Sequence, residues 1–142
     1  MAKSYKLKDG NYIDSGSISH NRKKLNEVLG ITLYEDPQGT NANVTLSESA
    51  ENFDYLEIYF ARHGGFNTFS SVKIFNPHEK HIDLSLVHSS NSETMQIIGG
   101  RVLINGTLLT RENTTLVQIN NLTVISHIDY TDLYIFKVIG YK

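Results

Sequence analysis

Four aromatic side chains stand beside polar residues in two turn-like segments of the sequence. Phe66 and Phe69 lie in GGFNTFSS, and Tyr130 and Tyr134 flank Asp132. Exposed rings next to amide or carboxylate groups are typical of saccharide sites, because the ring stacks on a pyranose while the polar groups hydrogen-bond its hydroxyls. These five residues are the predicted ligand-binding residues. The alternative is that Phe66 or Phe69 plugs one end of a hydrophobic core.

Metal binding and covalent catalysis find little support in the residue pattern. His78 and His81 lie in PHEKH, but zinc needs three or four ligands and no second cluster lies nearby in the sequence. The chain has no Gly-x-Ser-x-Gly elbow, no His-Glu-x-x-His motif and no phosphate-binding glycine loop. We therefore expect no metal, no cofactor and no enzymatic activity. A hydrolase of cell-wall glycan is the weakest of the alternatives.

Charge and composition exclude several classes of partner. Lys+Arg 13 against Asp+Glu 15 gives a net charge of -2, without the basic stripe that nucleic acid or anionic membranes require. There is no run of about 18 apolar residues for a membrane span, and the start MAKSYKLKDG lacks the apolar stretch of a signal peptide. Cysteine is absent, which excludes disulfides and thiolate sites. We expect synthesis in the cytoplasm and no membrane insertion.

The 142 residues are rich in β-formers and turn formers, which favours an all-β fold. About nine short apolar runs follow Ile31, so residues 31–142 are predicted to form an antiparallel β-sandwich, jelly-roll-like, as one head domain. The runs are ITLYE, NVTLS, YLEIYFAR, SVKIFN, IDLSLVHS, TMQIIGGRVLIN, TLLT, TLVQINNLTVIS and LYIFKVIGYK.

Glycine, proline and asparagine mark the expected turns between these runs. Residues 36–39, Asp-Pro-Gln-Gly, predict a β-turn, and Asn76-Pro77 predicts a break. Asn105-Gly106 is the strongest signal for a two-residue hairpin, expected to be of type I′. Gly99-Gly100 lies inside a strand pattern and predicts a bulge or a corner.

Residues 1–30 are predicted to form an N-terminal arm and a short neck helix. Asp9-Gly10 predicts a small hairpin. Apolar residues recur at helical spacing between Asn21 and Leu29, with Gly30 placed to end the helix.

The segment DYLEIYFARHGGFNTFSSVKIFN, residues 54–76, predicts two strands that are apolar on both faces. On an exposed hairpin one face should be polar, because successive side chains point to opposite sides of the sheet. One face carries Leu56, Ile58 and Phe60, and the other carries Tyr55, Tyr59 and Ala61 around Glu57. Something is therefore expected to cover the second face.

Two fragments carry a family resemblance that extends over residues 15–142. GTNANVTLSESAENFDYLEIYF and the terminal IFKVIGYK resemble the C-terminal modules of minor tail and receptor-binding proteins of phages and prophages of Gram-positive bacteria. Neither fragment is a catalytic motif, and the resemblance assigns no ligand residue.

The resemblance implies a β-sandwich head at the tip of a virion tail. Such a head is expected to be a homotrimer, to bind host cell-wall or surface saccharide during adsorption, and to contact other tail or baseplate proteins. A purely structural tail component without a sugar site is the runner-up. In a trimer, neighbouring copies would cover the second face of residues 54–76.

Overall fold

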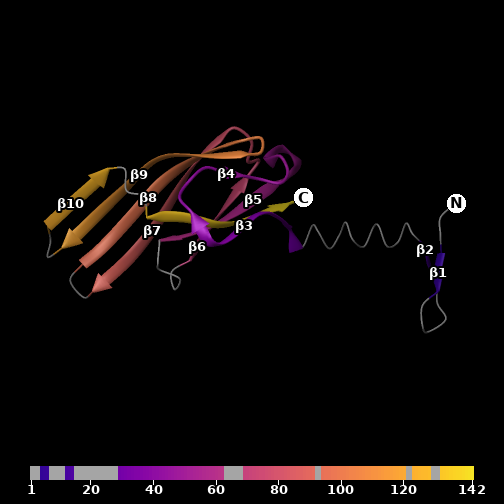
Figure 1. Ribbon diagram of the computed structural model, residues 1–142, viewed down its shortest axis with the longest axis horizontal. Helices are drawn as coiled ribbons and strands as arrows, with labels where there is room; N and C mark the ends of the chain where they lie inside the picture. Colours follow the sequence, from indigo (N-terminus) through magenta and orange to yellow (C-terminus); the bar gives the residue numbers. More distant parts are fainter. Residues whose placement is uncertain are drawn as a thin grey trace.

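The computed structural model describes residues 4–6, 12–14, 29–62, 69–91, 94–120, 123–128 and 132–142. Strands dominate these residues, and antiparallel sheets curl into a half-barrel, so the prediction of an all-β, sandwich-like fold is confirmed. Figure 1 shows the long strands running across the body of the molecule.

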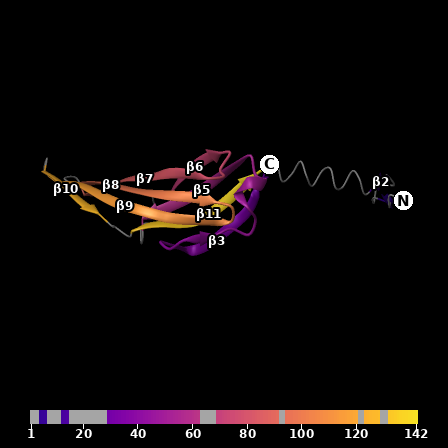
Figure 2. The same ribbon diagram turned by 90° about the horizontal axis from the view of Figure 1, so that it is seen from above.

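The first sheet is built from four consecutive long strands. They pair in the order β10-β9-β8-β7, and the short β4 (Val44–Thr45) pairs with the first residues of β9. The four strands are β7 (Lys80–Asn91), β8 (Thr94–Asn105), β9 (Leu108–Asn120) and β10 (Thr123–Ile128). In Figures 1 and 2, β10 lies at the end of the molecule farthest from the C terminus.

The second sheet has the order β3-β11-β5-β6, so the last strand of the chain lies between two early ones. Its strands are β3 (Ile31–Thr40), β5 (Tyr55–Arg62), β6 (Ser70–Phe75) and β11 (Leu133–Tyr141). A single 3-10 turn, η1 (Ala50–Asn52), precedes β5 and is capped by the Ser49 hydroxyl. A separate pair, β1 (Ser4–Lys6) and β2 (Tyr12–Asp14), is antiparallel as predicted for the region around Asp9-Gly10.

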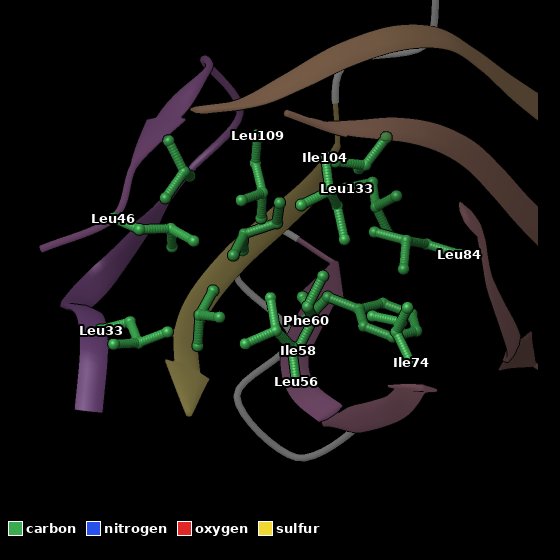
Figure 3. Packing of buried hydrophobic residues seen from close by; sticks show 14 of the residues in the cluster. Leu33, Leu46, Leu56, Ile58, Phe60, Ile74, Leu84, Ile104, Leu109 and Leu133 are labelled. Atoms are coloured by element: carbon green, nitrogen blue, oxygen red, sulfur yellow. The ribbon is translucent and has the colours of Figure 1, made fainter. Parts of the chain in front are cut away.

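One hydrophobic core lies between the two sheets. The strands that face the core contribute alternate residues, such as Leu56, Ile58 and Phe60 of β5, as the period of a pleated strand requires. Figure 3 shows Leu33 and Leu46 near one end of the cluster and Leu84 and Ile74 near the other, with Ile58 among the side chains between them. The core residues found in the described part of the chain lie between Leu33 and Val138. The predicted helix Asn21 to Leu29 falls almost wholly outside the described residues.

Residues 36–39, where the sequence predicts a β-turn, leave the regular pairing of β3 but do not end the strand. Glu35 pairs with Lys137 and Thr40 pairs with Ile135, so four residues of β3 bulge out opposite Phe136 alone. The Asp36 carboxylate accepts a hydrogen bond from the Gln38 amide at 2.9 Å, which holds the bulge closed. The chain then resumes pairing, because β11 continues on the far side.

Two further boundaries differ from the predicted runs. TLLT and the first half of TLVQINNLTVIS belong to one strand, β9, because residues 111–114 stay extended opposite β8 through a register shift instead of turning. The second half of the same run is β10, which folds back on β9 with Thr123 opposite Asn120. The shift in β9 lies directly after Gly100, as predicted for a bulge at Gly99-Gly100.

The hairpin between β8 and β9 is present, with a turn of a different type from the one expected. Asn105 pairs with Leu108, which places Gly106 and Thr107 at the two central positions. Gly106 has φ +57, whereas Thr107 has no positive φ. A positive φ at the first central position alone is the type II′ pattern, which also matches the right-handed twist of the strands. The Gly106 carbonyl also accepts a hydrogen bond from the Ala50 amide.

Gly106→Val is expected to lower the free energy of unfolding by roughly 1 to 2 kcal/mol, because a residue with a side chain is strained at positive φ. A Cβ at this position meets nothing closer than Ser49 Oγ at 3.9 Å, so the cost is conformational and not steric. Urea unfolding measures it, with Thr107→Val as the matched control at the neighbouring central position. Equal losses in the two variants would contradict the assigned turn.

Candidate functional site

The second face of β5 is the outer face of its sheet. Leu56, Ile58 and Phe60 point into the core, and the residues between them point away from it. Opposite them stand Lys137 and Tyr141 on β11 and Ser71, Lys73 and Phe75 on β6, so the rings and charges of three strands share one surface.

An aromatic pocket lies on this surface, where the β3 bulge meets β11 and β5. It has a volume of about 250 Å³, smaller than the pockets of about 300 to 1,000 Å³ that hold drug-sized ligands and nearer to the size of one sugar ring. The pocket is lined by four apolar or aromatic residues, Pro37, Tyr59, Phe69 and Phe136, and three charged ones, Glu35, Asp36 and Lys137.

Two irregularities in strand pairing build this aromatic pocket. The register of β11 shifts between Ile135 and Lys137 against both neighbours. Phe136 and Lys137 therefore both lie on the outer face, while Ile135 and Val138 point into the core. Opposite Phe136, Gly39 has φ +69, and a Cβ there would come within 2.7 Å of the Phe136 ring. Glycine is therefore required both for the backbone conformation and for the space that the ring takes.

Phe69 forms the exposed wall of the pocket. Its ring meets that of Phe136 edge-on, with centroids 5.1 Å apart, and 52% of the residue is exposed. An edge-to-face pair is a favourable arrangement of ring quadrupoles, so Phe136 orients the Phe69 ring while leaving much of its surface free.

Polar groups stand at the rim of the pocket. Lys137 Nζ donates a hydrogen bond to Glu35 Oε1 at 3.1 Å. Tyr34 donates to Asp36 Oδ2 at 3.4 Å, and burial together with the Asp36 charge raises the pKa of Tyr34. The rim thus presents carboxylate acceptors and an ammonium donor beside an apolar floor, a combination that suits a ligand with hydroxyls on one edge.

Glu57 lies two residues before Tyr59 on the same face of β5, and it is only 9% exposed. Ser71 Oγ donates to Glu57 Oε1 at 2.9 Å and Tyr141 Oη donates to Oε2 at 3.3 Å. The Tyr59 hydroxyl interacts with the same carboxylate. Hydroxyl donors from three strands therefore satisfy the one carboxylate on this face of β5, as a buried acid requires.

The tyrosines around Glu57 predict a loss of stability at alkaline pH. Burial, followed by the hydrogen bond to Glu57 and its charge, raises the pKa of Tyr59, and burial and the Glu57 charge raise that of Tyr141, above the ordinary value of 10.0. Above about pH 10 the unfolded chain releases these protons before the folded one does, so the free energy of unfolding falls as pH rises.

Tyr141→Phe is expected to make this decline shallower, since it removes one of the tyrosines whose pKa is raised. Urea unfolding of the wild type and the variant at about pH 8 and above about pH 10 measures the two slopes. Identical slopes would contradict a raised phenol pKa in the folded state.

A second cluster of rings lies on the same sheet face beyond Glu57. Tyr55 stacks on Tyr141 with centroids 4.4 Å apart and planes 7° from parallel, and Phe75 tilts against Tyr55 at 5.3 Å. Phe75 is 63% exposed. The outer face therefore carries aromatic surface at both ends of β5.

The structure separates the five predicted ligand residues. Phe69 lines the aromatic pocket. Asp132 and Tyr134 do not line it: Asp132 pairs with Arg62 at 3.6 Å, and Tyr134 lies opposite Ala61 near the start of β11. Phe66 and Tyr130 lie outside the described residues, so their predicted role is neither supported nor opposed.

Sequence reasoning missed Pro37, Tyr59 and Phe136 as members of the pocket. The sequence pattern places Tyr59 only on the second apolar face of residues 54–76. Phe136 follows Ile135 directly, so the period of the strand alone places it on the opposite face from the core residue Ile135. The position of Pro37 depends on the bulge in β3, which the local turn signal alone does not reveal.

The two histidines of PHEKH have different partners. His78 lies 3.1 Å from Glu51, whereas His81 lies 2.9 Å from Glu112 on β9. Within the described ranges, no group of three or more potential ligands is arranged to hold a metal ion. The same part of the chain has no helix with the length and hydropathy needed to span a membrane.

A comparison with protein-family models finds no match, and neither do comparisons with curated proteins and with solved structures. The proposed function therefore rests on the geometry of the aromatic pocket and on the sequence resemblance.

Proposed function

We propose that this protein is a non-enzymatic saccharide-binding module. The observation that carries the proposal is the aromatic pocket, in which a half-exposed Phe69 faces outward beside Tyr59 over a charged rim. A pyranose has an apolar face and a polar edge, so it matches a ring wall next to carboxylate and ammonium groups. The formal charge of -2 favours a ligand bound through stacking and hydrogen bonds over a polyanion.

The biological setting that we propose is the tip of a phage tail, with a host cell-wall or surface saccharide as the receptor. This setting rests on the resemblance of residues 39–60 and 135–142 to tail and receptor-binding modules. The first fragment contains Tyr59 and the second contains Phe136, and both residues line the aromatic pocket. A homotrimer would present three such pockets, and the effective concentration would turn modest affinity into firm attachment.

A purely structural role in the tail is the second candidate, and one surface favours it. The outer face of the first sheet carries exposed apolar side chains in adjacent rows: Val87 opposite Ile97 on β7 and β8, and Met95 in the next row. Val124 on β10 is exposed as well. Contiguous apolar surface of this kind is typical of contacts between proteins.

A glycan array, with a pull-down on purified Gram-positive cell walls beside it, tests the proposal. Binding to a defined class of saccharide, weakened by Phe69→Ala, is the expected result. Light scattering gives the mass in solution, where a multiple of 16.0 kDa is expected for the proposed oligomer. An oligomer that binds no glycan and no cell wall would favour the structural role, and release of reducing ends from the walls would favour a hydrolase.

A further inference from the structure

A large concavity in the described part of the chain lies on the opposite sheet from the aromatic pocket. It is an open trough of about 820 Å³ on the outer face of β7, β8 and β9. Its floor is one cross-strand row, in which Ser85 and Thr115 flank Gly99. We call it the glycine trough.

Gly99 and Gly100 have different reasons to be glycine. At Gly100 an added Cβ would come within 2.7 Å of Leu133 and 2.9 Å of Thr114, so packing under the sheet excludes a side chain. At Gly99 an added Cβ would meet only two backbone oxygens, both at 4.0 Å, and the residue has no positive φ.

The fold therefore has space and a suitable backbone for a side chain at Gly99, yet the floor is bare. Glycine in a strand interior weakens the strand, because it costs more conformational entropy and packs nothing. A glycine inside a strand often marks a bulge, a bend, or a place where a ligand or another backbone approaches closely. The register shift of β8 against β9 comes only after Gly100, and Gly99 itself pairs regularly with Ser85 and Thr115, so the shift does not account for it.

The side chains on one side of the floor limit the class of ligand that the trough can bind. Arg101 Nε donates to Asp83 Oδ1 at 2.8 Å, and this hydrogen bond, with the guanidinium charge, lowers the pKa of Asp83. His81 Nδ1 lies 2.9 Å from Glu112 Oε2. The Arg101 guanidinium and the His81 imidazole thus each already face a carboxylate, so they are poorly placed to bind a phosphate.

The remaining lining groups are small and polar. Ser85 and Thr115 bring hydroxyls, Asn113 brings an amide, and the carboxylates of the two pairs have lone pairs left for further donors. On the other side of the floor the next row is apolar, with Val87 opposite Ile97. A ligand here would meet paired charges and hydroxyls on one edge and an apolar row on the other.

We propose that the glycine trough is a second binding site, which takes a neutral polyhydroxylated ligand, a saccharide, with one ring laid on the bare backbone of Gly99. The site is distinct from the aromatic pocket and does not depend on it, because the two lie on different sheets. It lacks aromatic side chains among its lining residues, so hydrogen bonds to the ring hydroxyls supply most of its selectivity.

Residue-resolved NMR of the full chain, titrated with N-acetylglucosamine, glucose, galactose and rhamnose, tests the proposal. Saturable shifts of the Gly99, Ser85 and Thr115 amides with at least one of these sugars are the expected result. Gly99→Val is expected to abolish those shifts while the melting temperature stays the same or rises, since a β-branched residue fits an unstrained strand position. Ser85→Val is the second variant, for the case in which Gly99→Val disturbs the sheet.

The matched control is Ser126→Val, which adds the same side chain on an exposed position of β10 outside the trough. It is expected to leave the shifts unchanged, and so is Phe69→Ala, which acts on the other sheet. Shifts that persist in Gly99→Val, or the absence of shifts at the trough with all four sugars, would overturn the proposal. A lower mass in solution for Gly99→Val without any sugar shift would also overturn it and assign this face to contacts between copies.

Discussion

Ile58→Ala is expected to lower the free energy of unfolding by about 3 kcal/mol, within the range of 2 to 5 found for large-to-small changes in packed cores. Ile58 is fully buried in the middle of β5, between β11 and β6, and its side chain lies in the core between the two sheets (Figure 3). Truncation removes three methyl or methylene groups and leaves a cavity that β-sheets on both sides cannot close. Urea unfolding followed by circular dichroism measures the loss.

Val87→Ala provides the control for this prediction. Val87 is also a β-branched residue in a strand, but 65% of it is exposed on β7, so its truncation should change the stability by no more than about 0.5 kcal/mol. Comparable losses in the two variants would mean that the apolar outer face of the first sheet is itself buried, as in a contact with another copy. A small loss for Ile58→Ala would contradict the assignment of the inner face.

The two faces of β5 are a feature that the sequence predicts correctly. Residues two apart lie on one face of a strand, so the separation of Leu56, Ile58 and Phe60 from Tyr55 and Tyr59 follows from the period alone. Turn signals also act locally, which is why the breaks at Asn76-Pro77 and Gly106 were found in the right places. The class of the fold could be inferred from such short-range signals.

The partners of each strand depend on contacts that short-range signals do not encode. β11 lies between β3 and β5, about a hundred residues from its neighbour at the start of the domain, and only this pairing places Phe136 beside Pro37 and Tyr59. The same limit explains the turn at 36–39. Its local conformation was predictable, whereas its role as a bulge depends on β11 continuing past it.

The sequence resemblance predicts that neighbouring copies of the chain cover the second face of β5. Part of the cover comes from the chain itself, because Tyr141 stacks on Tyr55 and the hydroxyls of Tyr141 and Ser71 satisfy Glu57. What this leaves exposed includes aromatic surface, at Phe69 and Phe75. Such surface suits a ligand that stacks, and it is also compatible with the trimer that we propose.

Phe69→Ala is expected to weaken saccharide binding roughly tenfold, which corresponds to about 1.4 kcal/mol. The change removes the exposed wall of the aromatic pocket, and with it the ring on which a pyranose would stack. The fold should tolerate it with a loss of stability under about 1 kcal/mol, because Phe69 is half exposed and lies outside the core between the sheets. Calorimetry with the glycan selected on the array measures the affinity, and thermal unfolding measures the stability.

Phe75→Ala is the matched control, since it removes an equally exposed ring from the other end of β6 without touching the aromatic pocket. If the pocket holds the sugar, Phe75→Ala binds as the wild type does. If both variants lose affinity equally, the ligand extends over the whole outer face, from Phe69 past Glu57 to Tyr55. If neither does, the aromatic pocket is not the receptor site. In a trimer, retention on cell walls should fall more steeply than the affinity of one site, because three weakened contacts multiply in the avidity.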